Sequence, residues 1–65
     1  MKNVVLLITP REKEVLHLLS KGLTYKEMSE QMEVSTETVK KHLKNIYRKL
    51  GVQNKIGALN RVKLL

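Results

Sequence analysis

The amino-acid sequence predicts an all-α fold, a compact four-helix bundle that contains a helix-turn-helix and is preceded by a short N-terminal arm. The first observation is size, because 65 residues, 42% of them hydrophobic, make one small domain with a single core. The second is composition, because aliphatic residues and Met without any Phe or Trp favour stacked helices over a β-sandwich. The third is a series of four helix-capping signals, which divides the chain into an arm of residues 1–8 and a helical domain of residues 9–65.

The first two predicted helices begin at matching capping boxes. Thr9 is followed three residues later by Glu12, and the chain's one proline stands between them at the first helical position. Gly22 stands where a helix often ends with a left-handed residue. Thr24 and Glu27 then repeat the capping box, so a second helix is expected almost at once.

A third helix is predicted over residues 36–50, with Ser35 as its N-cap and Gly51 as its stop. Only two residues separate this cap from Met32, the last apolar residue of the second helix. So short a joint holds the two helices at a tight angle, which is the signature of a helix-turn-helix.

The third helix has two contrasting faces. Its apolar residues recur at spacings of four, three and four, so they lie within about 60° of one another around the helix axis. They predict one buried stripe, made of Val39, Leu43, Ile46 and Leu50. The opposite face carries Glu37, Lys41, Lys44 and Arg48, with Lys40 on its shoulder.

A fourth helix is predicted after Asn54, which is its expected N-cap. It is expected to bury Ala58, Leu59 and Val62. Gly57 weakens its first turn by about 0.5–1 kcal/mol relative to Ala.

Positive charge is confined to the second half of the chain. Residues 1–33 carry five basic and five acidic side chains, whereas residues 34–65 carry eight basic side chains and one acid, the whole of the net +7. A merely solvated helical face would mix both signs, yet Glu37–Lys41 is the one acid–base pair spaced four apart on the third helix. The asymmetry therefore favours a polyanionic partner whose phosphates relieve the repulsion.

Several other functions are disfavoured. The apolar run Val4–Ile8 is too short for a signal peptide or a membrane helix, so it is either an arm packed on the domain or a linker remnant. The absence of cysteine excludes disulfides and fits a reducing cytosol. His17 and His42 lack the Cys or Asp partners of a metal site or a catalytic triad, so no enzyme, metal or cofactor is expected.

Two non-enzymatic alternatives stay open at this point. A basic amphipathic helical module can bind an acidic protein or a membrane surface, although the tight turn before Ser35 commits the apolar face to a core and no Trp or Phe is present to anchor in lipid. A sigma-factor-like module that reads promoter DNA shares the same helix-turn-helix physics.

Five short motifs, in this order and spacing, carry a resemblance to a known family: T-P-R-E, E-V-L, G-x-T-x-K-E, V-S-x-x-T-V-K-x-H and I-x-x-K-L-G-V. From Thr9 to about Leu65 the chain resembles the LuxR/GerE-type helix-turn-helix domain, the DNA-binding output module of many bacterial response regulators and quorum-sensing activators. The resemblance implies a cytoplasmic, sequence-specific transcriptional regulator that binds double-stranded DNA as a homodimer, with RNA polymerase as a further candidate partner.

The resemblance also implies roles for individual residues. The third helix would be the recognition helix in the major groove, with base contacts from Lys40, Lys41 and Lys44. The DNA backbone would be held by Thr24, Tyr25, Lys26, Ser35, Thr38 and Arg48. The dimer surface on the fourth helix would comprise Ile56, Leu59, Asn60 and Lys63.

The sequence departs from the family pattern at two positions. Ser29 stands where alanine is usual between the second and third helices, and its hydroxyl is expected to bond back to a carbonyl. Gly57 stands where a glutamate often completes a capping box with residue 54, so the start of the fourth helix is expected to be softer.

Overall fold

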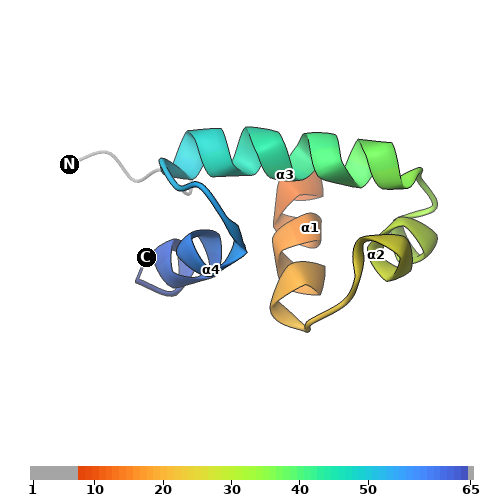
Figure 1. Cartoon of the computed structure of the whole chain (residues 1–65), viewed down its shortest axis with the longest axis horizontal. Helices are drawn as coiled ribbons and strands as arrows, with labels where there is room; N and C mark the ends of the chain where they lie inside the picture. The colour runs from red at the N-terminus through yellow and green to blue at the C-terminus, as the bar shows by residue number, and fades with distance from the viewer. Residues whose placement is uncertain (1–7, 65) are drawn as a thin grey trace.

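The computed structural model describes residues 8–64, and the side chains of residues 63 and 64 lie outside this description. The described residues form four helices and no strand, which confirms the all-α prediction. These helices are α1 (Pro10–Ser20), α2 (Tyr25–Met32), α3 (Thr36–Leu50) and α4 (Lys55–Leu64). Figure 1 shows α3 lying across the other three helices, with α1 beneath its middle and α2 and α4 on either side.

Helix α1 begins at the predicted capping box. The Glu12 N–H donates to Thr9 Oγ1 over 3.1 Å, and the Thr9 N–H donates to Glu12 Oε1 over 2.9 Å. After the helix ends, Gly22 adopts a φ of 81°, the left-handed conformation in which glycine avoids a steric penalty. Residues at or next to the helix ends therefore determine where α1 begins and ends.

The helix-turn-helix forms as the sequence predicts. Thr24 and Glu27 repeat the capping box, and Ser35 accepts the Thr38 N–H over 3.1 Å at the start of α3. Only Glu33 and Val34 lie between the last residue of α2 and this cap. Glu33 has a φ of 57° and a ψ of 43°, so the turn relies on a left-handed residue that is not glycine.

The core is aliphatic and lies where α1, α2 and α4 pack against α3. All four predicted stripe residues of α3 are buried, and Val39 and Ile46 have no exposed surface. Met28 and Met32 of α2 are also buried there. The buried hydrophobic residues are Ile8, Val15, Leu16, Leu18, Leu19, Met28, Met32, Val39, Leu43, Ile46, Leu50 and Ala58.

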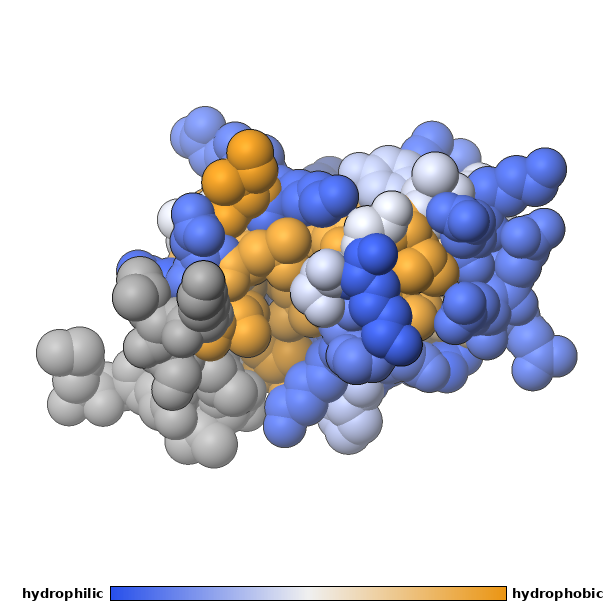
Figure 2. All heavy atoms as spheres, turned by 90° about the horizontal axis from the view of Figure 1, so that it is seen from below, coloured by the Kyte–Doolittle hydropathy of each residue, from blue (hydrophilic) through white to orange (hydrophobic). Residues whose placement is uncertain are grey.

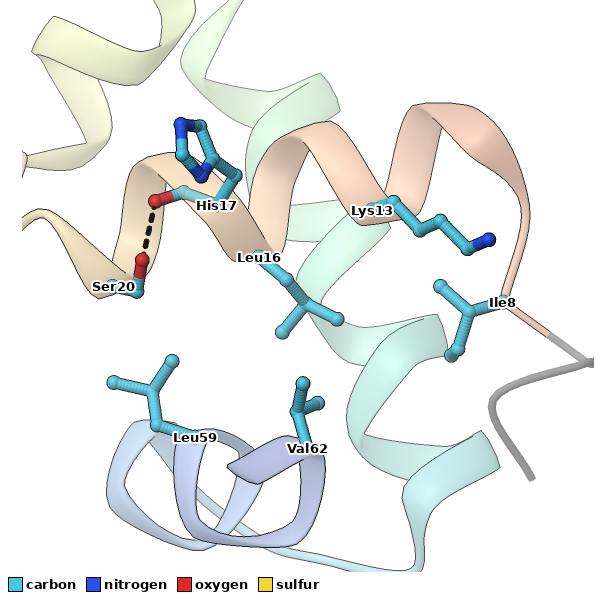
Figure 3. Close-up of a pocket in the computed structure, with 7 residues that line it drawn as sticks. All are labelled: Ile8, Lys13, Leu16, His17, Ser20, Leu59 and Val62. Carbon is cyan, nitrogen blue, oxygen red and sulfur yellow. Dashed lines mark hydrogen bonds between the residues drawn. The ribbon is translucent and has the colours of Figure 1, made fainter. Parts of the chain in front are cut away.

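The start of α4 matches the prediction, but its far end does not. Asn54 Oδ1 accepts the Gly57 N–H over 2.9 Å, and Ala58 is fully buried. Leu59 is only half-buried, and Val62 retains 36% of its surface, so the expectation that Val62 is buried is wrong. The reason is that Val62 faces a groove along α1 and does not enter the core (Figure 3).

Gly57 has a packing role that is not predicted from its low helix propensity. A Cβ atom at this position would lie 3.1 Å from Val52 Cβ, closer than side chains normally approach. Because Val52 is β-branched and its Cβ is fixed to the backbone, it has little freedom to move away. The glycine therefore allows the loop after α3 to pack closely on the first turn of α4.

Candidate nucleic-acid interface

The side of α3 that faces away from the core is exposed and cationic. Lys40, Lys41, Lys44 and Arg48 are all exposed, whereas the opposite stripe is buried. Figure 1 shows that no other helix of the described part lies over this side of α3. The fold thus presents the predicted base-contact lysines on one open surface, which we call the basic face.

Little of this charge is neutralised by neighbouring acids. Glu37 lies 3.6 Å from the Lys40 ammonium, not beside Lys41 as the spacing of four suggested, and both side chains are largely exposed. An exposed pair of this kind contributes only about 0–1 kcal/mol. Among the described residues, Lys41, Lys44 and Arg48 form no salt bridge.

One cation of α3 turns inward. The Lys49 ammonium lies 2.7 Å from Glu12 Oε1, and this bond joins the last turn of α3 to the first turn of α1. Glu12 is 4% exposed, whereas the Lys49 side chain keeps 31% of its surface. Burial raises the pKa of Glu12, but the bonds and charge of Lys49 together with the Thr9 amide outweigh it and lower that pKa below its usual value.

The ion pair of Glu12 and Lys49 is not predicted from the sequence, in which Lys49 is one of the eight basic residues of positions 34–65. Glu12 and Lys49 are 37 positions apart, so no local spacing rule connects them. The signal that was available is the position of Lys49 on the flank of the helix, about 90° from the centre of the apolar stripe. A long cation on such a flank can reach a neighbouring helix while keeping part of its stem in water.

The predicted backbone-contact hydroxyls are also helix caps. Thr24 Oγ1 accepts the Glu27 N–H over 3.1 Å, and Ser35 Oγ lies 3.0 Å from Thr38 Oγ1. A hydroxyl that accepts a bond keeps its own proton for donation, and the Ser35–Thr38 pair uses one of its two protons internally. Both caps lie at helix N-termini, where the unpaired amides and the helix dipole favour an anion.

The first turn of α2 brings two more predicted contacts to the surface. Tyr25 and Lys26 are both exposed there. Ser29 Oγ donates to the Lys26 carbonyl over 2.7 Å, as expected from its position, so the serine is accommodated without an unpaired hydroxyl. Burial, and secondarily the neighbouring Tyr25, raise the pKa of Tyr47 above its ordinary value.

Arg11 of α1 supports the turn before α3. Its guanidinium donates to the Met32 carbonyl over 3.4 Å and pairs with Glu14 over 3.0 Å. Arg11 and its neighbour Glu12 thus connect α1 to the segments before and at the end of α3. These contacts fix the orientation of the basic face relative to the rest of the domain.

The predicted dimer residues whose side chains the structure describes do not all share one surface. Ile56 is 70% exposed and Asn60 is exposed, so both are available on the outside of α4. Leu59 is half-buried and faces α1 across the groove (Figure 3). The side chain of Lys63 lies outside the described residues.

No group of three potential metal ligands comes together within residues 8–64. No helix in the described part of the chain is both long and apolar enough to cross a membrane.

The domain has four helices, and its two-residue turn leads into a helix with a buried stripe and an open cationic face. This arrangement is that of a helix-turn-helix DNA-binding domain. Comparison with known families agrees. The family model described as "Bacterial regulatory proteins, luxR family" matches residues 6–62. The chain therefore belongs to the luxR family, and it is a DNA-binding domain of a transcriptional regulator, not an enzyme.

Several relatives support this assignment. The chain is 41% identical over 51 residues to the nitrate/nitrite response regulator NarP of Escherichia coli, covering 78% of this chain and 24% of NarP. It is 49% identical over 55 residues to the transcriptional activator CarR of Pectobacterium carotovorum, covering 85% of this chain and 22% of CarR. It is 39% identical over 56 residues to the transcriptional regulatory protein DesR of Bacillus subtilis, covering 86% of this chain and 28% of DesR.

A solved structure shows the same fold. The crystal structure of response regulator ChrA, from a heme-sensing two-component system, superposes with a TM-score of 0.85 at 37% identity. The match covers 88% of this chain and 28% of ChrA. The chain thus spans about a quarter of the length of the proteins that it resembles.

Proposed function

We propose that this domain binds double-stranded DNA in a sequence-specific manner, with α3 in the major groove. The observation that carries the proposal is the basic face, because Lys41, Lys44 and Arg48 are exposed and unpaired among the described residues while the opposite stripe is fully buried. Lys40, Lys41 and Lys44 contact base edges, and a lysine ammonium donates to O6 and N7 of guanine.

The backbone contacts in this proposal surround the basic face. Thr24, Tyr25 and Lys26 hold phosphates from the start of α2, and Ser35 and Thr38 hold them from the start of α3. Arg48 contacts the backbone farther along α3. These contacts set the register of the domain on the duplex, while the lysines supply base preference.

The proposal includes a homodimer formed through α4. Ile56 is a large apolar side chain with 70% of its surface exposed, and Asn60 lies one turn farther along the same side of the helix. Lys63 belongs to the same proposed surface, and Leu59 borders it. We also place the protein in the bacterial cytoplasm, where the chromosome lies, with RNA polymerase as a further partner of a regulator whose relatives include a transcriptional activator.

Binding to a membrane or to an acidic protein through α3 is disfavoured. Both modes use the apolar face of a basic amphipathic helix. In this domain that face is buried against α1 and α2, and Val39 and Ile46 have no exposed surface. Only the charged side of α3 is left for a partner, which suits phosphates better than lipid tails.

The test is selection of bound sequences from random duplex DNA, followed by titrations with the selected site and a scrambled duplex. We expect a symmetric pair of half-sites, and an affinity that falls linearly on a log–log plot against salt. Affinity that is equal for both duplexes would contradict sequence reading, and affinity that does not depend on salt would contradict the role of the basic face.

Two alanine variants separate base reading from phosphate holding. Lys44→Ala should lose about 1–3 kcal/mol on the selected site and flatten the preference at one base pair per half-site. Lys26→Ala should weaken both duplexes alike and reduce the salt slope by about one. Lys21→Ala is the control, because Lys21 is exposed at the end of α1 farthest from α3 (Figure 1). An equal loss on both duplexes for Lys44→Ala would move base reading to Lys40 or Lys41.

A further inference from the structure

The basic face of α3 contains one acid. Glu37 is the one acidic side chain among residues 34–65, which carry eight basic ones. It lies in the first turn of α3. At about 100° per residue it is turned by about 40° from Lys41 and by about 20° from Lys44 around the helix axis. Glu37 therefore lies on the same side of α3 as the lysines that are proposed to contact bases.

The carboxylate of Glu37 is open to a partner. Its side chain keeps 82% of its surface, compared with 55% for Lys40. Its contact with a cation among the described residues is the 3.6 Å approach of Oε1 to the Lys40 ammonium, which is longer than a hydrogen bond. A carboxylate this exposed can turn toward a ligand without breaking a bond of the fold.

The stability of α3 does not by itself account for an acid at this position. An acid in the first turn interacts favourably with the helix dipole, but an acid at Thr36 would do the same about 100° away around the axis, farther from the centre of the basic face. At the centre of that face, Glu37 is repelled by the phosphates of any duplex. A repulsive group of this kind provides specificity, because it penalises every partner that offers it no bond.

The major groove presents a donor that suits a carboxylate. The N4 amino group of cytosine lies at the edge of this groove, and a Glu or Asp side chain accepts its hydrogen bond. Guanine, the partner of cytosine, presents O6 and N7 as acceptors, to which a lysine ammonium donates. Because Glu37 and Lys40 lie 3.6 Å apart, the two side chains together offer the acceptor and the donor that match a G·C pair.

We propose that Glu37 is a specificity-determining residue that accepts a hydrogen bond from the N4 amino group of a cytosine in the major groove, beside a guanine contact of Lys40. This inference rests on the proposed function, in which α3 lies in the major groove. The side of the domain opposite α3 is less suited to a polyanion, because apolar residues gather at its centre (Figure 2).

The first test measures the affinity of alanine variants of the full chain for the selected duplex and for a scrambled duplex. Glu37→Ala should bind the scrambled duplex more tightly than the parent does, and its preference for the selected duplex should fall by roughly tenfold. Glu30→Ala is the matched control, because it removes one exposed acid from α2 and should leave the preference unchanged. Both variants should keep the thermal midpoint of the parent, since Ala is a good helix former. If Glu37→Ala kept the preference of the parent, or changed both affinities alike, the proposal would be overturned.

A second test changes the DNA instead of the protein. Each cytosine of the selected half-site is replaced in turn by N4-methylcytosine, which still pairs with guanine but carries a methyl group in place of the N–H that faces the groove. At one position the parent should lose roughly tenfold in affinity, and Glu37→Ala should lose little more than it has already lost, because both changes remove the same bond. Equal losses in both proteins would assign the contact to another residue.

The outcomes also separate this inference from the proposed function. A parent that prefers the selected duplex but tolerates N4-methylcytosine at every position would contradict the role of Glu37 alone. A parent that binds the selected and the scrambled duplex equally would contradict sequence-specific binding, and the inference with it.

Discussion

Replacing Glu12 with Gln tests whether the ion pair with Lys49 holds α1 against α3. A glutamine still accepts the Thr9 N–H, now 2.9 Å from the carboxylate, so the capping box survives and only the charge is lost. The Lys49 ammonium then loses a partner 2.7 Å away, but its side chain is already 31% exposed and can turn to water. We expect Glu12→Gln to lower the free energy of unfolding by about 1–2 kcal/mol.

The reverse substitution should cost more. Lys49→Met removes the cation and leaves the Glu12 carboxylate, 4% exposed, without its charged partner. An uncompensated buried charge costs about 3–5 kcal/mol, which is a large part of the roughly 3–10 kcal/mol expected for a domain of this length. The two single variants should therefore differ in magnitude although they break the same contact, and the double variant should recover part of the loss.

Urea denaturation followed by circular dichroism at neutral pH measures these differences. Glu27→Gln is the matched control, because Glu27 occupies the same capping-box position in α2 but is exposed and forms no salt bridge among the described residues. It should cost no more than a few tenths of a kcal/mol. If Glu12→Gln were as mild as Glu27→Gln, or Lys49→Met milder than Glu12→Gln, the ion pair would not be a support of α3.

Two further predictions concern pH and the turn before α3. Because the folded pKa of Glu12 is lowered, the contribution of its carboxylate to the free energy of unfolding is fully present above its unfolded pKa of about 4.3. This contribution is lost as the pH falls through the folded pKa. The stability advantage of the parent over Glu12→Gln, measured by urea denaturation, should therefore shrink below about pH 4 and stay constant between pH 6 and 8. Glu33→Gly should raise the free energy of unfolding by about 0.5–1 kcal/mol, because Glu33 has a φ of 57°, which glycine adopts without steric cost. Glu30→Gly inside α2 is the control and should lower the free energy of unfolding by a similar amount. If both variants were less stable than the parent, the left-handed turn would not be strained.

The features that the sequence predicted correctly are those set by local chemistry. The caps at Thr9, Thr24 and Ser35 lie within three residues of their partners, and the stripe on α3 repeats at the helical period, so both can be recognised without knowing the fold. The open basic face followed, because it is the opposite side of that stripe. Whether its lysines contact bases stays a prediction.

The features that the sequence did not predict depend on contacts between distant segments or on backbone detail. The pairing of Glu12 with Lys49 requires the crossing of α1 and α3 to be known. Val62 keeps 36% of its surface because it lines the groove between α1 and α4, whereas the helical period alone predicts that it is buried. By helix propensity alone Gly57 only weakens α4, because the sequence does not show how closely this position approaches Val52.

The N-cap of α3 serves both the fold and the proposed DNA contact, and one substitution separates these roles. Ser35 Oγ accepts the Thr38 N–H over 3.1 Å, and aspartate caps a helix about as well as serine while its charge suits the helix N-terminus. Ser35→Asp should therefore keep the thermal midpoint of the parent. It supplies no proton, however, and brings a negative charge to the place proposed for a phosphate. Losing a hydrogen bond to a charged group costs about 1.5–3 kcal/mol, so DNA affinity at low salt should fall by roughly 10- to 100-fold on selected and scrambled duplexes alike. Thr9→Asp makes a comparable change at the cap of α1 and should leave binding unaltered; if Ser35→Asp also bound DNA like the parent, the phosphate contact at the start of α3 would have to be abandoned.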